Sequence, residues 1–190
     1  MSQYKKLADD VLDALDRVGD RMSRSLRDRS EAQRRKLLEI VEETRMRDRQ
    51  MSQNGGAPDV DVDADVIDPG FGATGRGDWF GDADQRYRDE FFDEYPESEA
   101  AVVHHAIEQN VMRRYPSLNI TRSEMDSVQN LRGIPAEINS RVHLSGIRRM
   151  WNEFYRHHAD SGTVPTVDDL AEYARLVDDA FGDLFDPPVR

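Results

Sequence analysis

The sequence predicts a mostly helical protein of the α+β class, in which a little strand is surrounded by helices. Two observations lead to this prediction. Apolar residues recur every three or four positions through residues 4–50 and again after residue 140, which is the period of an amphipathic helix. The apolar run at residues 100–104, in contrast, has the length of one short buried strand.

The composition excludes several classes of protein. The chain has 190 residues, a formal net charge of −12 and no cysteine, which excludes a disulfide scaffold, a thiolate zinc site and a cysteine nucleophile. No apolar run approaches the roughly 18 residues that a membrane span needs. The N-terminus lacks the apolar core of a secretory signal. We therefore expect no signal peptide and no membrane partner.

Residues 1–50 form the first predicted part, an N-terminal helical segment. Its apolar stripe comprises Tyr4, Leu7, Val11, Leu15, Val18, Met22 and Leu26, followed by Leu37, Leu38, Ile40, Val41 and Met46. Because the stripe is narrow and its flanks are charged, such a segment cannot bury itself alone. It is expected to pair as a helical hairpin or dimer stalk, or to dock on another protein in trafficking.

Residues 51–87 form the second part, an acidic and glycine-rich linker. The motif Asn-Gly-Gly-Ala-Pro ends the helical pattern. The alternating aspartates from Asp59 invite a calcium loop, but an EF-hand needs glycine and glutamate where this chain has Ala64 and Gly70. Two interpretations remain, a solvated linker and an acidic segment that covers a nucleic-acid groove.

Residues 88–190 form the third part, the predicted folded domain. Its first strand is expected at residues 100–104, beside a helix at residues 106–114 that stops before a proline. A Gly-Ile-Pro motif at residues 133–135 predicts a turn.

Two stronger helices are expected in the last third of the chain. Thr166 followed by Asp169 resembles a capping box, and the helix that it opens ends at Gly182. The helix before it is expected to expose His157 and His158 at its C-terminus, where partial positive charge is favourable. Its apolar, core-forming face comprises Leu144, Ile147, Trp151, Phe154 and Tyr155.

The residues that carry chemistry lie between His104 and Tyr155. His104 and His105 end the predicted strand, so their side chains point to opposite sides. Asn139 and His143 lie four positions apart and share one face of a helix. Two such ligands and a third from a strand make an open metal site. The other histidine of the pair is then available as a general base.

These residues also resemble a known family. A histidine pair, an asparagine and a histidine on a helix resemble the HNH nucleases, also called ββα-metal or His-Me finger enzymes. More narrowly, three motifs are similar to the C-terminal toxin domains of bacterial polymorphic and Rhs-type toxins. The motifs are His-His-Ala-Ile-Glu-Gln, Asn-Leu-Arg-Gly-Ile-Pro and Val-His-Leu-Ser-Gly-Ile-Arg-Arg-Met-Trp-Asn-Glu-Phe-Tyr. The resemblance covers residues 88–190 and implies a ββα-metal core with surrounding helices.

The resemblance assigns roles to single residues. It implies that His104 ligates a divalent metal ion, that His105 activates water, and that Asn130 orients His105 through its carbonyl oxygen. Asn139 and His143 stand nine and thirteen positions after Asn130, where the family carries further metal ligands. Asn139 departs from the histidine of the family, and its harder amide oxygen favours magnesium or manganese, with zinc or nickel as the other choices.

The resemblance further implies a metal-dependent endonuclease that cleaves nucleic acid, DNA in preference to RNA, and acts as a bacterial toxin. Such a toxin is made in the bacterial or archaeal cytoplasm, is neutralised by an immunity protein, and is delivered into target cells. Residues 1–56 are then a docking segment for a secretion or injection apparatus. The arginines expected to bind flanking phosphates are Arg132, Arg141, Arg148 and Arg149.

Two other classes stay open at this point. One is a non-catalytic protein: either a nucleic-acid-binding module, which would keep the arginines and tolerate changes at His105, or a structural or adaptor protein, which would use the N-terminal helices and the acidic linker for assembly. The other is a cytoplasmic HNH nuclease of phage defence.

Overall fold

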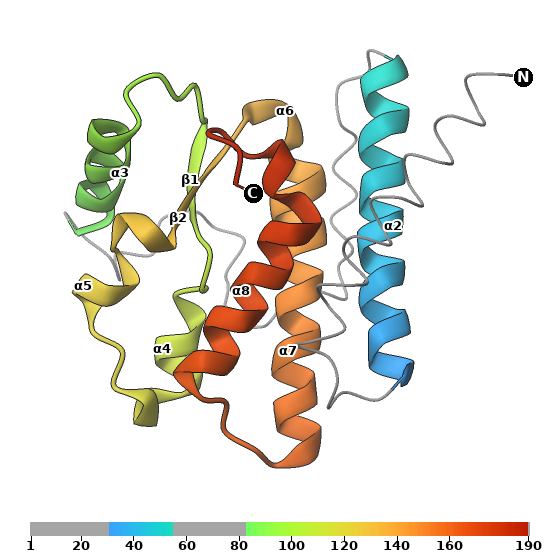
Figure 1. Cartoon of the computed structure of the whole chain (residues 1–190), viewed down its shortest axis with the longest axis vertical. Helices are drawn as coiled ribbons and strands as arrows, with labels where there is room; N and C mark the ends of the chain where they lie inside the picture. Colours follow the sequence, from blue (N-terminus) through green and yellow to red (C-terminus); the bar gives the residue numbers. More distant parts are fainter. Residues whose placement is uncertain (1–30, 55–82, 190) are drawn as a thin grey trace, which may run out of the picture.

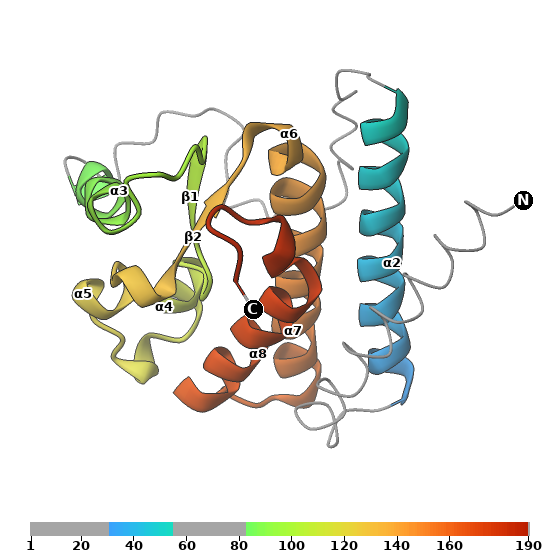
Figure 2. The ribbon, with the colours of Figure 1, turned by 45° about the horizontal axis from the view of Figure 1, so that its top comes forward.

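The computed structural model describes residues 31–54 and 83–189 of the chain. Figures 1 and 2 show two strands between α3 on one side and α7 and α8 on the other, with α2 beyond α7. This part is mostly helical with one antiparallel two-stranded sheet, so the predicted α+β class is confirmed. The elements are α2 (Glu31–Asn54), α3 (Ala83–Glu94), β1 (Val102–His105), α4 (Asn110–Arg114), η2 (Pro116–Leu118), α5 (Arg122–Met125), η3 (Val128–Asn130), β2 (Leu131–Ile134), α6 (Ala136–Ile138), η4 (Asn139–Ile147), α7 (Arg148–Ser161), α8 (Val167–Phe181) and η5 (Gly182–Leu184).

The sheet is formed by β1 and β2, which pair with Val103 opposite Gly133. The strand predicted at residues 100–104 is confirmed, although it begins two residues later. The turn predicted at residues 133–135 is wrong, because Gly133 lies inside β2. Glycine is required there for another reason, since a Cβ atom would meet the backbone oxygen of Asp186 at 1.9 Å.

The hairpin has two faces, because side chains alternate along each strand. One face turns toward the main hydrophobic core and toward η4 and α8, and we call it the core face. The other turns toward α3 and α5, and we call it the α3 face. The core face carries Val102, His104, Arg132 and Ile134, and the α3 face carries Val103, His105, Leu131 and Gly133.

A continuous helical segment crosses the core face, because the π-helix η4 runs directly into α7. The predicted apolar face of this helix is confirmed for Ile147, Trp151, Phe154 and Tyr155, which are all buried. It is wrong for Leu144, which is 38% exposed. The reason is the wider turn of the π-helix, whose hydrogen bonds span five residues and rotate a position chosen on the α-helical period out of the buried face.

The last helix, α8, begins with the predicted capping box. The Asp169 amide donates to Thr166 Oγ1 over 3.1 Å, and the Thr166 amide donates to Asp169 Oδ2 over 2.7 Å. These two bonds satisfy N–H groups that the first turn leaves without helical partners. The helix runs to Phe181, and Gly182 follows it as predicted.

Two other local predictions are corrected. The helix expected at residues 106–114 is present only at its end, as α4. His158, which was expected to be exposed, is buried against Phe154 with ring centroids 4.6 Å apart. Its Nδ1 lies 2.8 Å from Thr163 Oγ1, so the chain that leaves α7 folds back over the imidazole.

Helix α2 belongs to the same core as the last hundred residues. Leu37, Ile40 and Val41 are buried in one hydrophobic cluster with residues of η4, α7 and α8. Helices α2 and η4 approach each other closely at Gly146, where a Cβ atom would lie 2.7 Å from the Thr44 methyl group. This half of the N-terminal segment therefore finds its apolar partner within the chain.

Several predictions concern residues that the structure does not describe. Residues 1–30 and 55–82 lie outside it, and with them the first apolar stripe, most of the acidic linker and the proposed groove cover. The two ends of the predicted linker are helical, residues 51–54 in α2 and residues 83–87 in α3.

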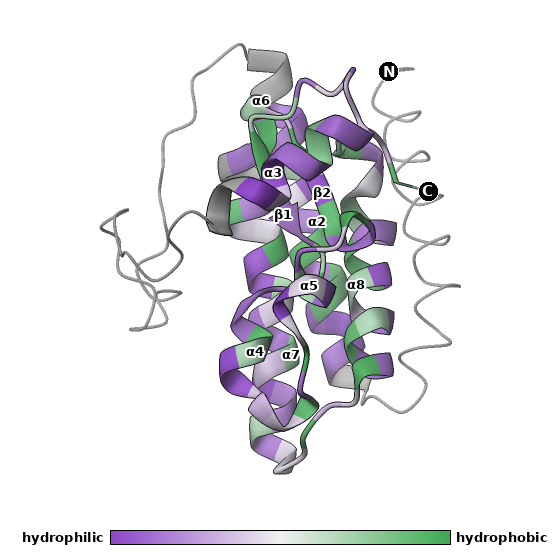
Figure 3. Ribbon diagram, turned by 90° about the vertical axis from the view of Figure 1, so that its left-hand side faces the viewer, coloured by the Kyte–Doolittle hydropathy of each residue, from purple (hydrophilic) through white to green (hydrophobic). Residues whose placement is uncertain are grey.

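The helices are amphipathic, and in Figure 3 α4, α7 and α8 each show hydrophilic and hydrophobic surfaces. Across residues 31–54 and 83–189, none of the helices combines the length and apolar character that crossing a bilayer requires.

Candidate functional site

Three of the predicted metal ligands gather on the core face of the hairpin. His104 reaches from β1 to η4, where its ring lies edge-on to the ring of His143 with centroids 4.5 Å apart. His143 Nδ1 in turn lies 2.9 Å from Asn139 Oδ1, one turn earlier in η4. Strand and helix therefore bring two imidazoles and one amide together, although 35 positions separate His104 from Asn139 in the sequence.

The hydrogen bonds in this cluster set the tautomer of His143. An amide oxygen only accepts, so the Nδ1–H of His143 donates to Asn139 and a lone pair remains on Nε2. His104 Nε2 is buried and has no hydrogen-bond partner among the described residues. Two imidazole nitrogens are thus left in one small region, one of them at the cost that an unsatisfied buried polar atom carries.

Both imidazoles of the cluster are held in the neutral form. Burial, followed by the nearby His143, holds the pKa of His104 well below its usual value. Burial, followed by the positive charge of Arg148, lowers the pKa of His143 to about 4. At neutral pH both rings are uncharged, which is the state in which histidine binds a metal ion.

We tested whether the cluster fits a divalent cation. Within the described ranges, no three side chains of histidine, cysteine, aspartate or glutamate come together as a metal site. The donors are the Nε2 atoms of the two imidazoles, and the remaining coordination would come from water or phosphate oxygen. The predicted ligand Asn139 is bonded to the Nδ1 side of the His143 ring, away from Nε2, so it holds His143 and does not ligate the same ion. This set fits an open site for an ion that accepts nitrogen ligands.

A second group of polar residues lies along α7 beyond the cluster. Glu108 is half-buried and accepts a hydrogen bond of 2.9 Å from the Tyr155 hydroxyl. Burial raises the pKa of Glu108 to about 7, against the opposing effects of Tyr155, Arg148 and Arg114. Arg114 stacks over the Tyr155 ring at 4.5 Å. A carboxyl group that titrates near neutrality therefore lies beside Arg148, which also acts on His143.

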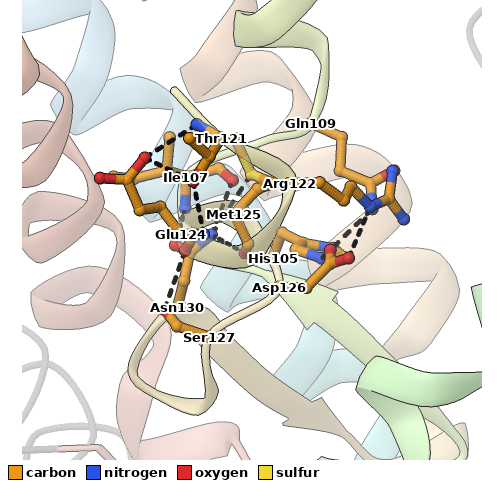
Figure 4. Close-up of polar contacts among 10 residues, drawn as sticks. All are labelled: His105, Ile107, Gln109, Thr121, Arg122, Glu124, Met125, Asp126, Ser127 and Asn130. Carbon is orange, nitrogen blue, oxygen red and sulfur yellow. Dashed lines mark hydrogen bonds and ion pairs between the residues drawn. The ribbon is translucent and has the colours of Figure 1, made fainter. Parts of the chain in front are cut away.

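His105 lies on the α3 face, away from the metal-ligand cluster. Its Nε2 is 3.0 Å from Asp126 Oδ1, and only 8% of its side chain is exposed. The ring packs against Tyr87 of α3 with centroids 4.6 Å apart. Figure 4 shows His105, Asp126 and Arg122 in a row, with Gln109 beside them. A buried imidazole bonded to a carboxylate is the arrangement that general-base histidines use.

Asn130 holds the loop around His105. Its Oδ1 accepts from the Ile107 amide over 2.7 Å, and its Nδ2 donates to the Met125 carbonyl over 2.8 Å. Its own carbonyl accepts from the Ala106 amide over 2.7 Å. All these bonds go to backbone groups on both sides of the long connection between the strands, and Figure 4 draws those that join Asn130 to Ile107 and Met125. Asn130 therefore fixes the backbone next to His105, and the imidazole itself is bonded to Asp126.

The four arginines predicted to bind phosphate differ in their surroundings. Arg132 makes a two-pronged ion pair with Asp178 of α8, at 2.9 and 2.6 Å. Arg149 pairs with Glu43 of α2 at 2.9 Å. Arg148 lies near His143 and Glu108, as their pKa shifts show. Arg141 lies in η4, and its side chain is outside the described part. Arg132, opposite His104 in the sheet, and Arg148 both lower the pKa of an imidazole of the cluster.

The structure thus unites His104, Asn139 and His143. His105 lies on the opposite face of β1, and Asn130 binds the backbone that follows His105. Sequence reasoning missed Asp126 altogether. One signal was present, because Thr121 and Glu124 have the spacing of a capping box and form one around α5. That signal places a short helix, but it does not show that the next residue reaches His105.

Comparisons with known proteins identify no relative of the chain. No family model matches the sequence, and neither a curated protein nor a solved structure matches it.

Proposed function

We propose that the chain is a metal-dependent endonuclease of the HNH type that hydrolyses phosphodiester bonds, with DNA as its substrate. The observation that carries the proposal is the His104 imidazole, whose buried Nε2 has no hydrogen-bond partner in residues 31–54 and 83–189 and whose ring lies against that of His143. Burying such a nitrogen costs stability unless something binds it. The proposal is also supported by the order of the elements, because two antiparallel strands, separated in the chain by α4 to η3, are followed by the helical segment of η4 and α7 that crosses them.

In this proposal the core face of β1 binds the metal ion and the α3 face carries the general base. His104 and His143 hold the cation, and Asn139 keeps His143 in the tautomer that exposes Nε2. When bound, the cation would stabilise the negative charge that builds up on the phosphate and the leaving oxygen. His105 accepts a proton from water as the water oxygen bonds to phosphorus and the bond to the leaving oxygen breaks. Because His105 is the last residue of β1, a substrate strand that crosses this end of the sheet can meet both faces.

The geometry bears on the choice of metal. The sequence favours magnesium or manganese because Asn139 offers oxygen, but that oxygen already accepts the Nδ1–H of His143. The remaining donors are mainly imidazole nitrogens, which suit nickel and zinc, whereas magnesium prefers oxygen ligands. We propose a transition-metal ion, nickel, zinc or manganese, at this site.

The test combines metal binding with cleavage. Plasmid DNA and single-stranded RNA are incubated with the purified full chain and magnesium, manganese, nickel, zinc or EDTA, and metal binding is measured by calorimetry. His104→Ala should lose both binding and cleavage, whereas His105→Ala should lose cleavage and keep binding. His157→Ala, a histidine change outside the cluster, is the matched control. Absence of cleavage by the native chain with every metal would contradict the proposal.

We extend the proposal to a toxin that acts inside bacteria, on the strength of the resemblance to polymorphic toxin domains. Expression of the native chain in a bacterial cytoplasm should then stop growth, and His105→Ala should remove the effect at equal protein level. An immunity protein should restore growth. Docking of residues 1–56 on a secretion apparatus predicts that deletion of residues 1–30, which leaves α2 and its core contacts in place, blocks export. Normal growth of cells that contain folded native chain would count against the toxin role.

A further inference from the structure

One carboxylate faces the predicted general base, and the nuclease proposal gives it no role. Asp126 Oδ1 lies 3.0 Å from His105 Nε2, and the two side chains are only 17% and 8% exposed. The other oxygen, Oδ2, accepts from the Nε–H of Arg122, one turn earlier in the chain. His105, Asp126 and Arg122 thus form a chain of charge-assisted hydrogen bonds at the α3 face (Figure 4).

We propose that Asp126 is the positioning residue of the nuclease site, which fixes the tautomer and the orientation of His105. The effect of Asp126 on catalysis rests on the proposed function, whereas the contact between Asp126 and His105 does not. A carboxylate only accepts, so His105 donates from Nε2 and keeps its basic lone pair on Nδ1. The same nitrogen lies 3.2 Å from Gln109 Nε2, and the shorter contact to a charged oxygen decides where the proton resides.

The surrounding structure is built to keep Asp126 in place. Helix α5 (Arg122–Met125) begins after the capping box of Thr121 and Glu124, and Asp126 is the residue that caps its C-terminal end. A residue outside this helix stabilises its last turn, because Asn130 Nδ2 donates to the Met125 carbonyl over 2.8 Å. Asn130 therefore contributes to the base indirectly, by holding the helix that carries the carboxylate.

The decisive variant is Asp126→Asn, because with Arg122 in place it should change the tautomer of His105. The Nε–H of Arg122 needs an acceptor, so it keeps the amide oxygen of the new asparagine and turns the NH2 group toward His105. Nε2 must then accept, and the ring proton moves to Nδ1. We expect the ¹⁵N spectrum of the His105 ring in the full chain to report Nε2–H in the native protein and Nδ1–H in Asp126→Asn.

Activity gives the second readout. In Asp126→Asn, kcat should fall by at least about 10-fold and approach the loss of about 10²–10⁴-fold expected for removing a general base, while KM and metal binding stay unchanged. Asp126→Glu, which keeps a carboxylate, should recover part of kcat. Asp160→Asn, the same change at an exposed position of α7, is the matched control and should alter neither the spectrum nor kcat.

The outcomes separate this inference from the nuclease proposal. A ring proton that stays on Nε2 in Asp126→Asn, or a native kcat in that variant beside an inactive His105→Ala, overturns the positioning role of Asp126. A shifted tautomer together with full activity of His105→Ala supports the contact and instead overturns His105 as the base.

Discussion

The two faces of β1 present two neighbouring histidines in opposite ways. On the core face, His104 Nε2 has no hydrogen-bond partner in the part of the chain that the structure describes, and the ring lies against another neutral imidazole. On the α3 face, His105 has a carboxylate at 3.0 Å, itself paired with an arginine. The two residues are equally buried, at 8% and 6% exposure, so burial does not distinguish them.

This difference teaches that the partners, and not the depth, decide what a buried histidine can do. A neutral ring with an open nitrogen is suited to a metal ion, which needs the lone pair. A ring that donates to a carboxylate is better suited to accept a proton, because the carboxylate stabilises the cation that forms. The strand alternation therefore assigns different chemistry to adjacent residues.

The largest effect, on the free energy of unfolding, is expected from adding a side chain at Gly133 on the α3 face. Its Cβ would meet the Asp186 backbone oxygen at 1.9 Å and Phe91 Cζ at 2.9 Å. Because a backbone atom cannot step aside, Gly133→Ala should lower the free energy of unfolding by about 3 kcal/mol. Gly146→Ala, whose nearest neighbour is the Thr44 methyl group at 2.7 Å, is the matched change in η4 and should cost less. Urea unfolding measures both, and an equal or smaller loss for Gly133→Ala would refute the comparison.

The second prediction concerns metal binding to the core face alone. Nickel, zinc or manganese at about 100 times its dissociation constant should stabilise the native chain by about 2.7 kcal/mol. His104→Ala should abolish this gain, and His105→Ala should retain it, because only His104 belongs to the ligand cluster. Thermal unfolding with and without metal checks both variants. Equal stabilisation of His104→Ala and the native chain would place the ion elsewhere.

The third prediction uses pH and the carboxyl group beside the core face. The pKa of Glu108 is raised from 4.5 to about 7 by burial. Between these values the folded chain holds a proton that the unfolded chain has released, so Glu108 makes the protein less stable as pH rises through this window. Glu108→Gln should therefore be more stable than the native chain at pH 8, by an amount on the order of 2 kcal/mol.

Unfolding of Glu108→Gln and the native chain in urea at pH 5 and pH 8 measures this effect. The gain should be smaller at pH 5, since there the native carboxyl group is protonated in the folded state. A gain that is the same at both pH values would show that packing, and not the charge, causes it.

The smallest effect is expected when each histidine is replaced by phenylalanine. His104→Phe removes a buried nitrogen that has no hydrogen-bond partner in the described part, so it should raise the free energy of unfolding by about 1 kcal/mol without metal. His105→Phe deprives Asp126 of a hydrogen-bond partner and should lower the free energy of unfolding by about 1 kcal/mol. Metal-free unfolding curves test the signs, and a loss of stability in both variants would remove the contrast between the faces.

Part of the fold and of the site follows from local rules. The helix around Trp151 and the capping box at Thr166 were predictable, because period and capping depend on residues within one or two turns. The shared face of Asn139 and His143 was predictable for the same reason. Leu144 and Gly133 were misjudged, since a π-helix and the returning C-terminal segment altered their surroundings.

The sequence by itself determined that His104 and His105 point to opposite sides, because alternation is a property of any strand. It determined as well that Asn139 lies one turn before His143. Only the tertiary structure decided what each imidazole meets, His143 on one face and Asp126 on the other. The physical reason is that these partners come from segments whose packing depends on the whole core, and spacing in the chain carries no information about that packing.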